Sequence, residues 1–134
     1  MRCRRLSVVT IGALLVVPAV ASCSSDKAPV CSSIDDLEGS VQNLRDVNVQ
    51  QGAVAEIKSD VAQVQTDFQT VKSDAKDQFS AQITQLSSAL VASSNSANKA
   101  AAAPSVSAVA GLAVSLTTVS NATKALSSAV ADTC

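Results

Sequence analysis

Apolar residues recur at intervals of three and four through the middle of this chain. Such spacing places them on one face of an α-helix, and no proline interrupts positions 51–94. The intervals are heptad-like at first, and an added interval of four between Ala75 and Ile83 resembles a coiled-coil stutter. The sequence therefore predicts one helix over about 51–94, a length typical of a rod or hairpin arm. The apolar line comprises Val54, Ile57, Val61, Val64, Phe68, Val71, Ala75, Phe79, Ile83, Leu86 and Leu90.

Two further periodic runs flank this stretch. The first predicts a short helix over 34–45, with Ser32 or Ser33 as its N-cap and acidic residues in its first turn. The second predicts a helix over 105–131, because its intervals of three and four fit a helix better than the competing strand at 114–119. Its apolar line comprises Val106, Val109, Leu112 or Ala113, Leu116, Val119, Thr123, Leu126 and Val130.

The expected fold is all-α, as a long antiparallel helical hairpin or an elongated three-helix bundle with coiled-coil-like packing. Residues 93–104 are predicted to form the turn before the last helix. No acidic residue lies between Asp77 and Asp132, and small side chains dominate there. This composition favours a tight antiparallel helix pair. The alternative is a poorly packed, Ser/Ala-rich segment that carries O-linked sugar.

The first residues have the pattern of an export signal. Arg2, Arg4 and Arg5 precede a short apolar run, too short to span a bilayer, which ends at Val20-Ala21-Ser22-Cys23. This ending resembles the lipobox of bacterial lipoproteins. The resemblance implies cleavage after Ser22 and a lipid on the Cys23 sulfur; the alternative is an ordinary signal peptide with a cysteine nearby. The expected organisation is a signal peptide at 1–22, a lipidated tether at 23–31 and a helical domain at 32–134, on the outer face of the cell membrane.

Cys31 and Cys134 remain once Cys23 carries lipid and Cys3 leaves with the signal. The exported side of a membrane is oxidising, so a disulfide between them is expected. The predicted helix lengths agree, because the two shorter helices laid end to end nearly match the long one. The beginning of the first helix and the end of the last would then meet. The alternative is a redox-active or metal-binding pair of thiols.

Composition limits the chemistry of the exported part. Removing the three signal arginines from ten basic residues leaves seven against eleven acidic ones, a net charge of −4, which argues against a nucleic-acid partner. The chain has no histidine, the commonest acid–base residue near neutral pH. We therefore predict no enzyme, no metal site and no cofactor. The carboxylates are interpreted as a solvated helix face, and comprise Asp35, Asp36, Glu38, Asp46, Glu56, Asp60, Asp67, Asp74 and Asp77.

The mature start Cys23-Ser24-Ser25 and the heptad character of residues 34–75 resemble the major helical lipoprotein of enteric outer membranes. The Ala, Val, Ser and Thr bias is similar to small actinobacterial lipoproteins of unassigned function. The lipobox-like ending, the long periodic helix and the lack of catalytic residue types favour a membrane-anchored, non-catalytic spacer or protein-interaction module, held by its lipid and associated with a protein partner or with itself. A second hypothesis is a carrier of a lipid or glycolipid between its helices. A third is a regulator of a membrane sensor or transporter.

Overall fold

The computed structural model describes residues 28–47 and 53–134, and the regular secondary structure in these ranges is entirely α-helical. The all-α prediction is therefore confirmed. The predicted signal peptide and Cys23 lie outside the described residues. The helices are α1 (Pro29–Asp46), α2 (Val54–Ala75), α3 (Ser80–Ala102) and α4 (Val106–Val130).

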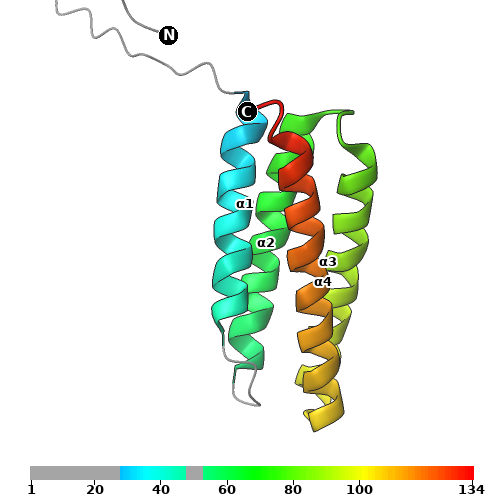
Figure 1. Ribbon diagram of the computed structural model, residues 1–134. Helices are drawn as coiled ribbons and strands as arrows, with labels where there is room; N and C mark the ends of the chain where they lie inside the picture. The colour runs from blue at the N-terminus through cyan, green and yellow to red at the C-terminus, as the bar shows by residue number, and fades with distance from the viewer. Residues whose placement is uncertain (1–27, 48–52) are drawn as a thin grey trace, which may run out of the picture.

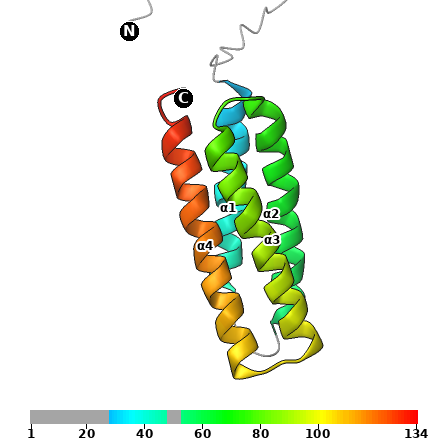
Figure 2. The same cartoon turned by 90° about the vertical axis from the view of Figure 1, so that its right-hand side faces the viewer.

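The four helices form an antiparallel bundle in which each helix packs on the next and α4 packs back onto α1 (Figure 1). Contacts are most extensive within the N-terminal hairpin, α1 with α2, and within the C-terminal hairpin, α3 with α4. The 90° view shows the α3–α4 turn at the end of the bundle opposite the C-terminus (Figure 2). The described chain is thus a four-helix bundle, where the sequence predicted three helices.

The predicted single helix over 51–94 is wrong at its middle, because α2 ends at Ala75 and α3 begins at Ser80. The Gln78 N–H donates to the Ala75 carbonyl at 3.0 Å. Lys76, with φ 52° and ψ −123°, occupies the first central position of a type II′ turn. Phe79 is left-handed as well, with φ 58° and ψ 27°. Folding back lets the two halves of one apolar stripe bury each other, which a single straight helix cannot do.

The apolar line itself is predicted correctly on both sides of the turn. Ten of its eleven members are buried, and Phe79, inside the turn, is partly buried. A three-helix arrangement would leave much of this stripe for a second chain to cover. The four-helix fold instead buries it within one chain. The members with the least exposure are Ile57, Val64, Val71 and Leu86, each 0% exposed.

We expect Lys76→Gly to stabilise the protein by about 1 kcal/mol, because glycine adopts this positive φ without the steric cost that lysine bears. Lys72→Gly is the matched control, since Lys72 is an exposed lysine inside α2. That control should destabilise by about 1 kcal/mol. Urea denaturation followed by circular dichroism measures both. Destabilisation of equal size by the two substitutions would indicate a continuous helix through the turn.

The start of α1 also differs from the prediction. The helix begins at Pro29, five residues before the expected start, so the last three residues of the predicted tether are helical. Proline is favoured in the first helical turn, where its missing N–H has no partner to lose. Ser33, predicted as a candidate N-cap, is buried instead. Its hydroxyl lies 3.2 Å from the Pro29 carbonyl and also donates to an Asp74 carboxylate oxygen on α2.

A second bond of the same kind lies one heptad along the N-terminal hairpin. Ser40 of α1 donates to Asp67 of α2, and both partners sit seven residues from the first pair. Gln63 donates to the other Asp67 oxygen at 3.0 Å. Hydrogen bonds to a carboxylate are stronger than those between neutral groups. The two Ser–Asp bonds therefore fix the register of α1 on α2.

A double-mutant cycle tests this register. We expect Ser33→Ala and Asp74→Ala to show a coupling free energy of about 1–2 kcal/mol, because each substitution removes the same charge-assisted hydrogen bond. The control cycle pairs Ser33→Ala with Asp77→Ala, whose carboxylate is exposed beyond the end of α2. This control should give a coupling near zero. Equal coupling in both cycles would contradict the direct Ser33–Asp74 bond.

The C-terminal hairpin agrees with its prediction at α4 but not at the turn before it. The predicted turn over 93–104 is wrong for most of its length, because α3 continues to Ala102. α4 lies within one residue of the expected 105–131 at each end, and Ser105 caps it by accepting the Ala108 N–H at 3.2 Å. The competing strand at 114–119 is helical. Small buried side chains on α3 allow the tight pairing with α4, and comprise Ala89, Ser93, Ala97 and Ala100. Val106 was predicted on the apolar face of this helix, but it is 82% exposed at the start of the helix.

Candidate functional site

The two cysteines predicted to pair lie at the same end of the bundle. Cys31 is buried in the first turn of α1, and Cys134 follows α4. Their side chains are at disulfide-bonding distance and their Cα atoms are 5.7 Å apart, inside the usual range for a bridge. The predicted pairing is therefore realised by a fold with four helices rather than three. The bridge closes the ring of helices by joining the first to the last.

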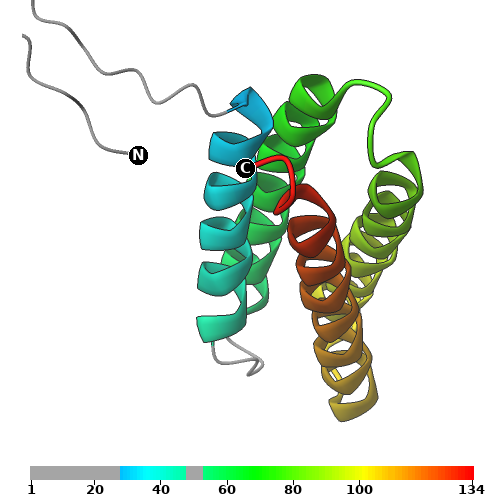
Figure 3. The same cartoon turned by 45° about the horizontal axis from the view of Figure 1, so that its top comes forward.

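Three parts of the chain lie at this end. The view tilted to bring this end forward shows the C-terminus beside the start of α1, and the α2–α3 turn at the same end of the bundle (Figure 3). The bridge and the turn are thus the two covalent links between the hairpins, and both lie at this end. The opposite end of the α2–α3 and α1–α4 interfaces is held by side-chain packing alone.

The carboxylates do not gather into a reactive site. Asp35, Asp36 and Glu38 are exposed on α1, as predicted for a solvated face. Asp67 and Asp74 are the exceptions, since they accept the serine hydroxyls between α1 and α2. Within residues 28–47 and 53–134, no group of three or more acidic or cysteine side chains is placed to hold a metal ion.

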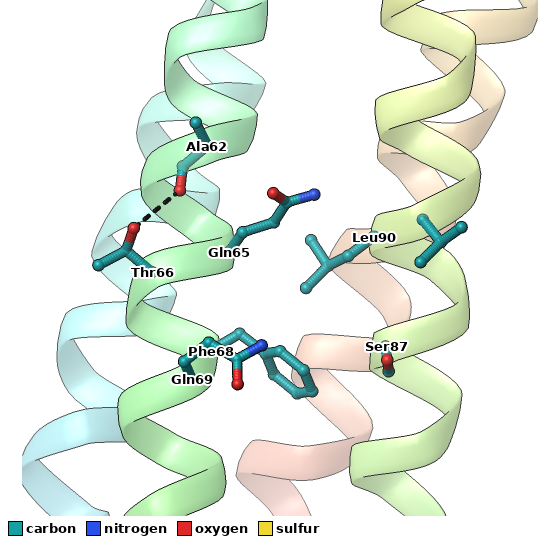
Figure 4. A pocket seen from close by; sticks show the side chains of 8 residues that line it. Ala62, Gln65, Thr66, Phe68, Gln69, Ser87 and Leu90 are labelled. Atoms are coloured by element: carbon teal, nitrogen blue, oxygen red, sulfur yellow. Dashed lines mark hydrogen bonds between the residues drawn. The ribbon is translucent and has the colours of Figure 1, made fainter.

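One hollow lies between the hairpins, along α2 and α3, and is called here the α2/α3 groove. It has a volume of about 440 Å³. Phe68 points from α2 toward α3, and Leu90 points back from α3 (Figure 4). No lining side chain is charged, and Val91, at 57% exposed, adds an accessible apolar surface. The full lining is Ala62, Gln65, Thr66, Phe68, Gln69, Ser87, Leu90 and Val91.

The groove continues toward the beginning of α2. A second hollow of about 200 Å³ shares Ala62 and Gln65 with it and reaches Lys58 and Asn98. The two hollows together form an uncharged groove with Lys58 at one end. Its shape suits an extended ligand held by contacts with side chains rather than a substrate enclosed for chemistry.

The two hairpins also contact each other through α1 and α4. The surface between these two helices is called here the α1/α4 groove. Two adjoining hollows of about 210 and 200 Å³ share Arg45, Ser120 and Lys124. Glu38 lines the second hollow, together with Thr123. The Thr123 hydroxyl oxygen is buried and has no hydrogen-bond partner among the described residues. This groove is therefore polar and basic where the α2/α3 groove is uncharged.

Helix α4 satisfies the length and composition of a membrane-crossing helix, with a mean hydropathy of 1.3 over its most apolar window. The same helix supplies Leu112, Val119 and Leu126 to the bundle core, each 0% exposed. A core helix of a soluble bundle passes the same test. Packing between α1 and α3 accounts for part of the apolar composition of α4, since 39% of that window is buried.

Comparison with known proteins identifies no relative of this chain: no family model matches it, and no curated protein or solved structure is significantly similar to it.

The amino-acid sequence predicted the pairing of Cys31 with Cys134, but it predicted neither of the two grooves. A groove between helices depends on which helices are neighbours, and the prediction joined α2 and α3 into one. The only sequence signals for the break were the doubled interval of four around Phe79 and the polar residues on either side of it. Arg45 and Lys124 are separated by most of the chain, so no local pattern connects them.

Proposed function

We propose that this chain is a lipid-anchored, non-catalytic helical protein of the bacterial cell envelope that acts as a spacer or protein-interaction module. The Val20-Ala21-Ser22-Cys23 sequence, which resembles a lipobox, carries the proposal. Two or more acyl chains on Cys23 would give stable membrane attachment. In this arrangement the disulfide end of the bundle faces the membrane, because Cys23 precedes Pro29 by six positions.

The anchor is tested by the intact mass of the chain recovered from bacterial membranes. We expect a mature protein that begins at Cys23 and carries a diacylglyceryl group. Cys23→Ser should abolish the lipid and release the protein from the membrane fraction. Cys3→Ser is the control and should change neither result, because Cys3 belongs to the predicted signal. An unlipidated chain with an intact Cys23 would overturn the anchor.

The interaction role is tested by cross-linking the lipidated protein in the membrane. Since the bundle buries its own apolar stripe, a partner would use exposed surfaces, which include Val91, Val106 and Val114 at 57%, 82% and 68% exposure. We expect one defined cross-linked partner, or a homo-oligomer, that is lost when Val106 and Val114 are changed to Ser. A strict monomer with no partner would contradict the interaction role.

A second candidate is a carrier of a lipid or glycolipid. The uncharged α2/α3 groove, with Phe68, Leu90 and Val91 in its lining, favours this candidate. Native mass spectrometry of the Cys23→Ser chain tests it, because this variant has no covalent lipid to confuse the result. A carrier should retain a lipid mass that Val91→Glu removes. A clean protein mass after extraction in mild detergent would dismiss the carrier.

A further inference from the structure

The α1/α4 groove holds the feature of this bundle that the proposed function leaves unexplained. Arg45 of α1 and Lys124 of α4 line both of its hollows, so two cations face one surface from opposite sides of the interface. No salt bridge joins either of them to a carboxylate within the described part of the chain. Two cations against the one carboxylate of Glu38 leave the groove with a net positive charge on a chain that is negative overall.

Hydrogen-bond donors surround the two cations. Asn121 lines the first hollow, and Ser120, at 6% exposure, lines both. The Thr117 hydroxyl also lines the first hollow, but it donates to the Ala113 carbonyl at 3.0 Å. The Thr123 hydroxyl oxygen is buried, out of reach of a ligand in the second hollow. The Ser120 hydroxyl and the Asn121 amide are therefore the donors that an acceptor-rich ligand can use.

We propose that the α1/α4 groove binds a phosphate group, positioned by Arg45 and Lys124 and hydrogen-bonded by the Ser120 hydroxyl and the Asn121 side-chain amide. A phosphate monoester carries up to two negative charges and three acceptor oxygens, which matches two cations and several donors. A carboxylate offers one charge and two oxygens, so it satisfies fewer of these groups.

One acidic residue faces the same groove. Glu38 lines the second hollow and repels an anion there, so the phosphate lies toward the part that Arg45, Ser120 and Lys124 share. The Glu38 carboxylate can instead accept a hydrogen bond from a hydroxyl group of the ligand. A soluble sugar phosphate fits both requirements. Under the proposed anchoring, Arg45 also lies about 20 Å along α1 from Cys31, away from the headgroups of the anchoring membrane.

The test is a titration of the isotope-labelled full chain, carrying Cys23→Ser, with inorganic phosphate in NMR. We expect saturable shifts of the amides near Arg45, Ser120 and Lys124. Arg45→Gln and Lys124→Gln should each weaken binding about tenfold, because each removes a charge-assisted contact. Lys72→Gln removes the same charge from the outer surface of α2 and should leave the affinity unchanged. Equal weakening by Lys72→Gln would reduce the effect to general electrostatics and overturn the site.

Two further variants distinguish a specific phosphate site from non-specific attraction of anions to the positive surface. Ser120→Ala removes the hydroxyl that lines both hollows, so phosphate affinity should fall several-fold while the amide spectrum of the free protein stays that of the folded bundle. Glu38→Gln should raise the affinity, since it removes the one opposing charge. No change in either variant would contradict the proposed contacts.

The source of the phosphate is distinguished by two further ligands. Glucose 1-phosphate should bind more tightly than inorganic phosphate, and sodium acetate more weakly. Vesicles of phosphatidic acid in phosphatidylcholine provide the lipid headgroup. Binding to these vesicles without binding to glucose 1-phosphate would keep the phosphate site but assign it to a lipid. Because all of these measurements use the Cys23→Ser chain, their outcome does not depend on whether the protein is lipid-anchored.

Discussion

Replacing both Cys31 and Cys134 by Ala is expected to lower the free energy of unfolding by about 4–5 kcal/mol. The bridge closes a loop with a sequence separation of 103, and a cross-link over so long a loop removes much of the conformational freedom of the unfolded chain. A small domain has a total stability of roughly 5–15 kcal/mol, so this loss is a large share. Urea denaturation of the Cys23→Ser chain, with and without the two alanines, measures it.

Reduction of the unsubstituted pair provides the control. Reductant should lower the urea midpoint of the chain with both cysteines to that of the double-alanine variant. It should not affect the double-alanine variant itself. The intact mass must rise by the two hydrogens of the opened bridge. Free thiols before reduction, or a midpoint that reductant leaves unchanged, would show that Cys31 and Cys134 are not joined in the protein.

Phe68→Ala is expected to destabilise the bundle by about 3–5 kcal/mol. Phe68 is 3% exposed and projects from α2 into the interface with α3, so its removal leaves a cavity beside Leu90 where the hairpins meet. The cost combines the lost burial of the ring with the cavity that remains. Thermal unfolding followed by circular dichroism measures the loss.

The chain offers one matched control for this substitution. Phe79 is the other of its two phenylalanines, and it lies partly buried in the α2–α3 turn. Phe79→Ala should cost about 1 kcal/mol, because a partly buried ring leaves less of a cavity. A larger effect at Phe79 than at Phe68 would place the apolar interface elsewhere and contradict the observed pairing of α2 with α3.

Much of the fold followed from the amino-acid sequence. The intervals of three and four identified the buried faces of the helices, because 3.6 residues per turn leave only one face for the core. The start of the last helix followed from Pro104, which interrupts a helix for local steric reasons, and its apolar intervals predicted how far it runs. The Cys31–Cys134 pairing was predictable as well, since any antiparallel packing of the first and last helices brings their outer ends together.

The break between α2 and α3 was decided by tertiary structure, because the irregular apolar intervals around Phe79 do not by themselves distinguish a turn from a stutter in one helix. Lys76 and Phe79 have no local preference for positive φ, and the residues around them are compatible with a continuous helix. Their strain persists because the turn lets α2 and α3 bury their apolar faces against each other, a gain that no local window of sequence contains. The two grooves exist for the same reason: each lies between helices that became neighbours only when the chain folded back at this turn.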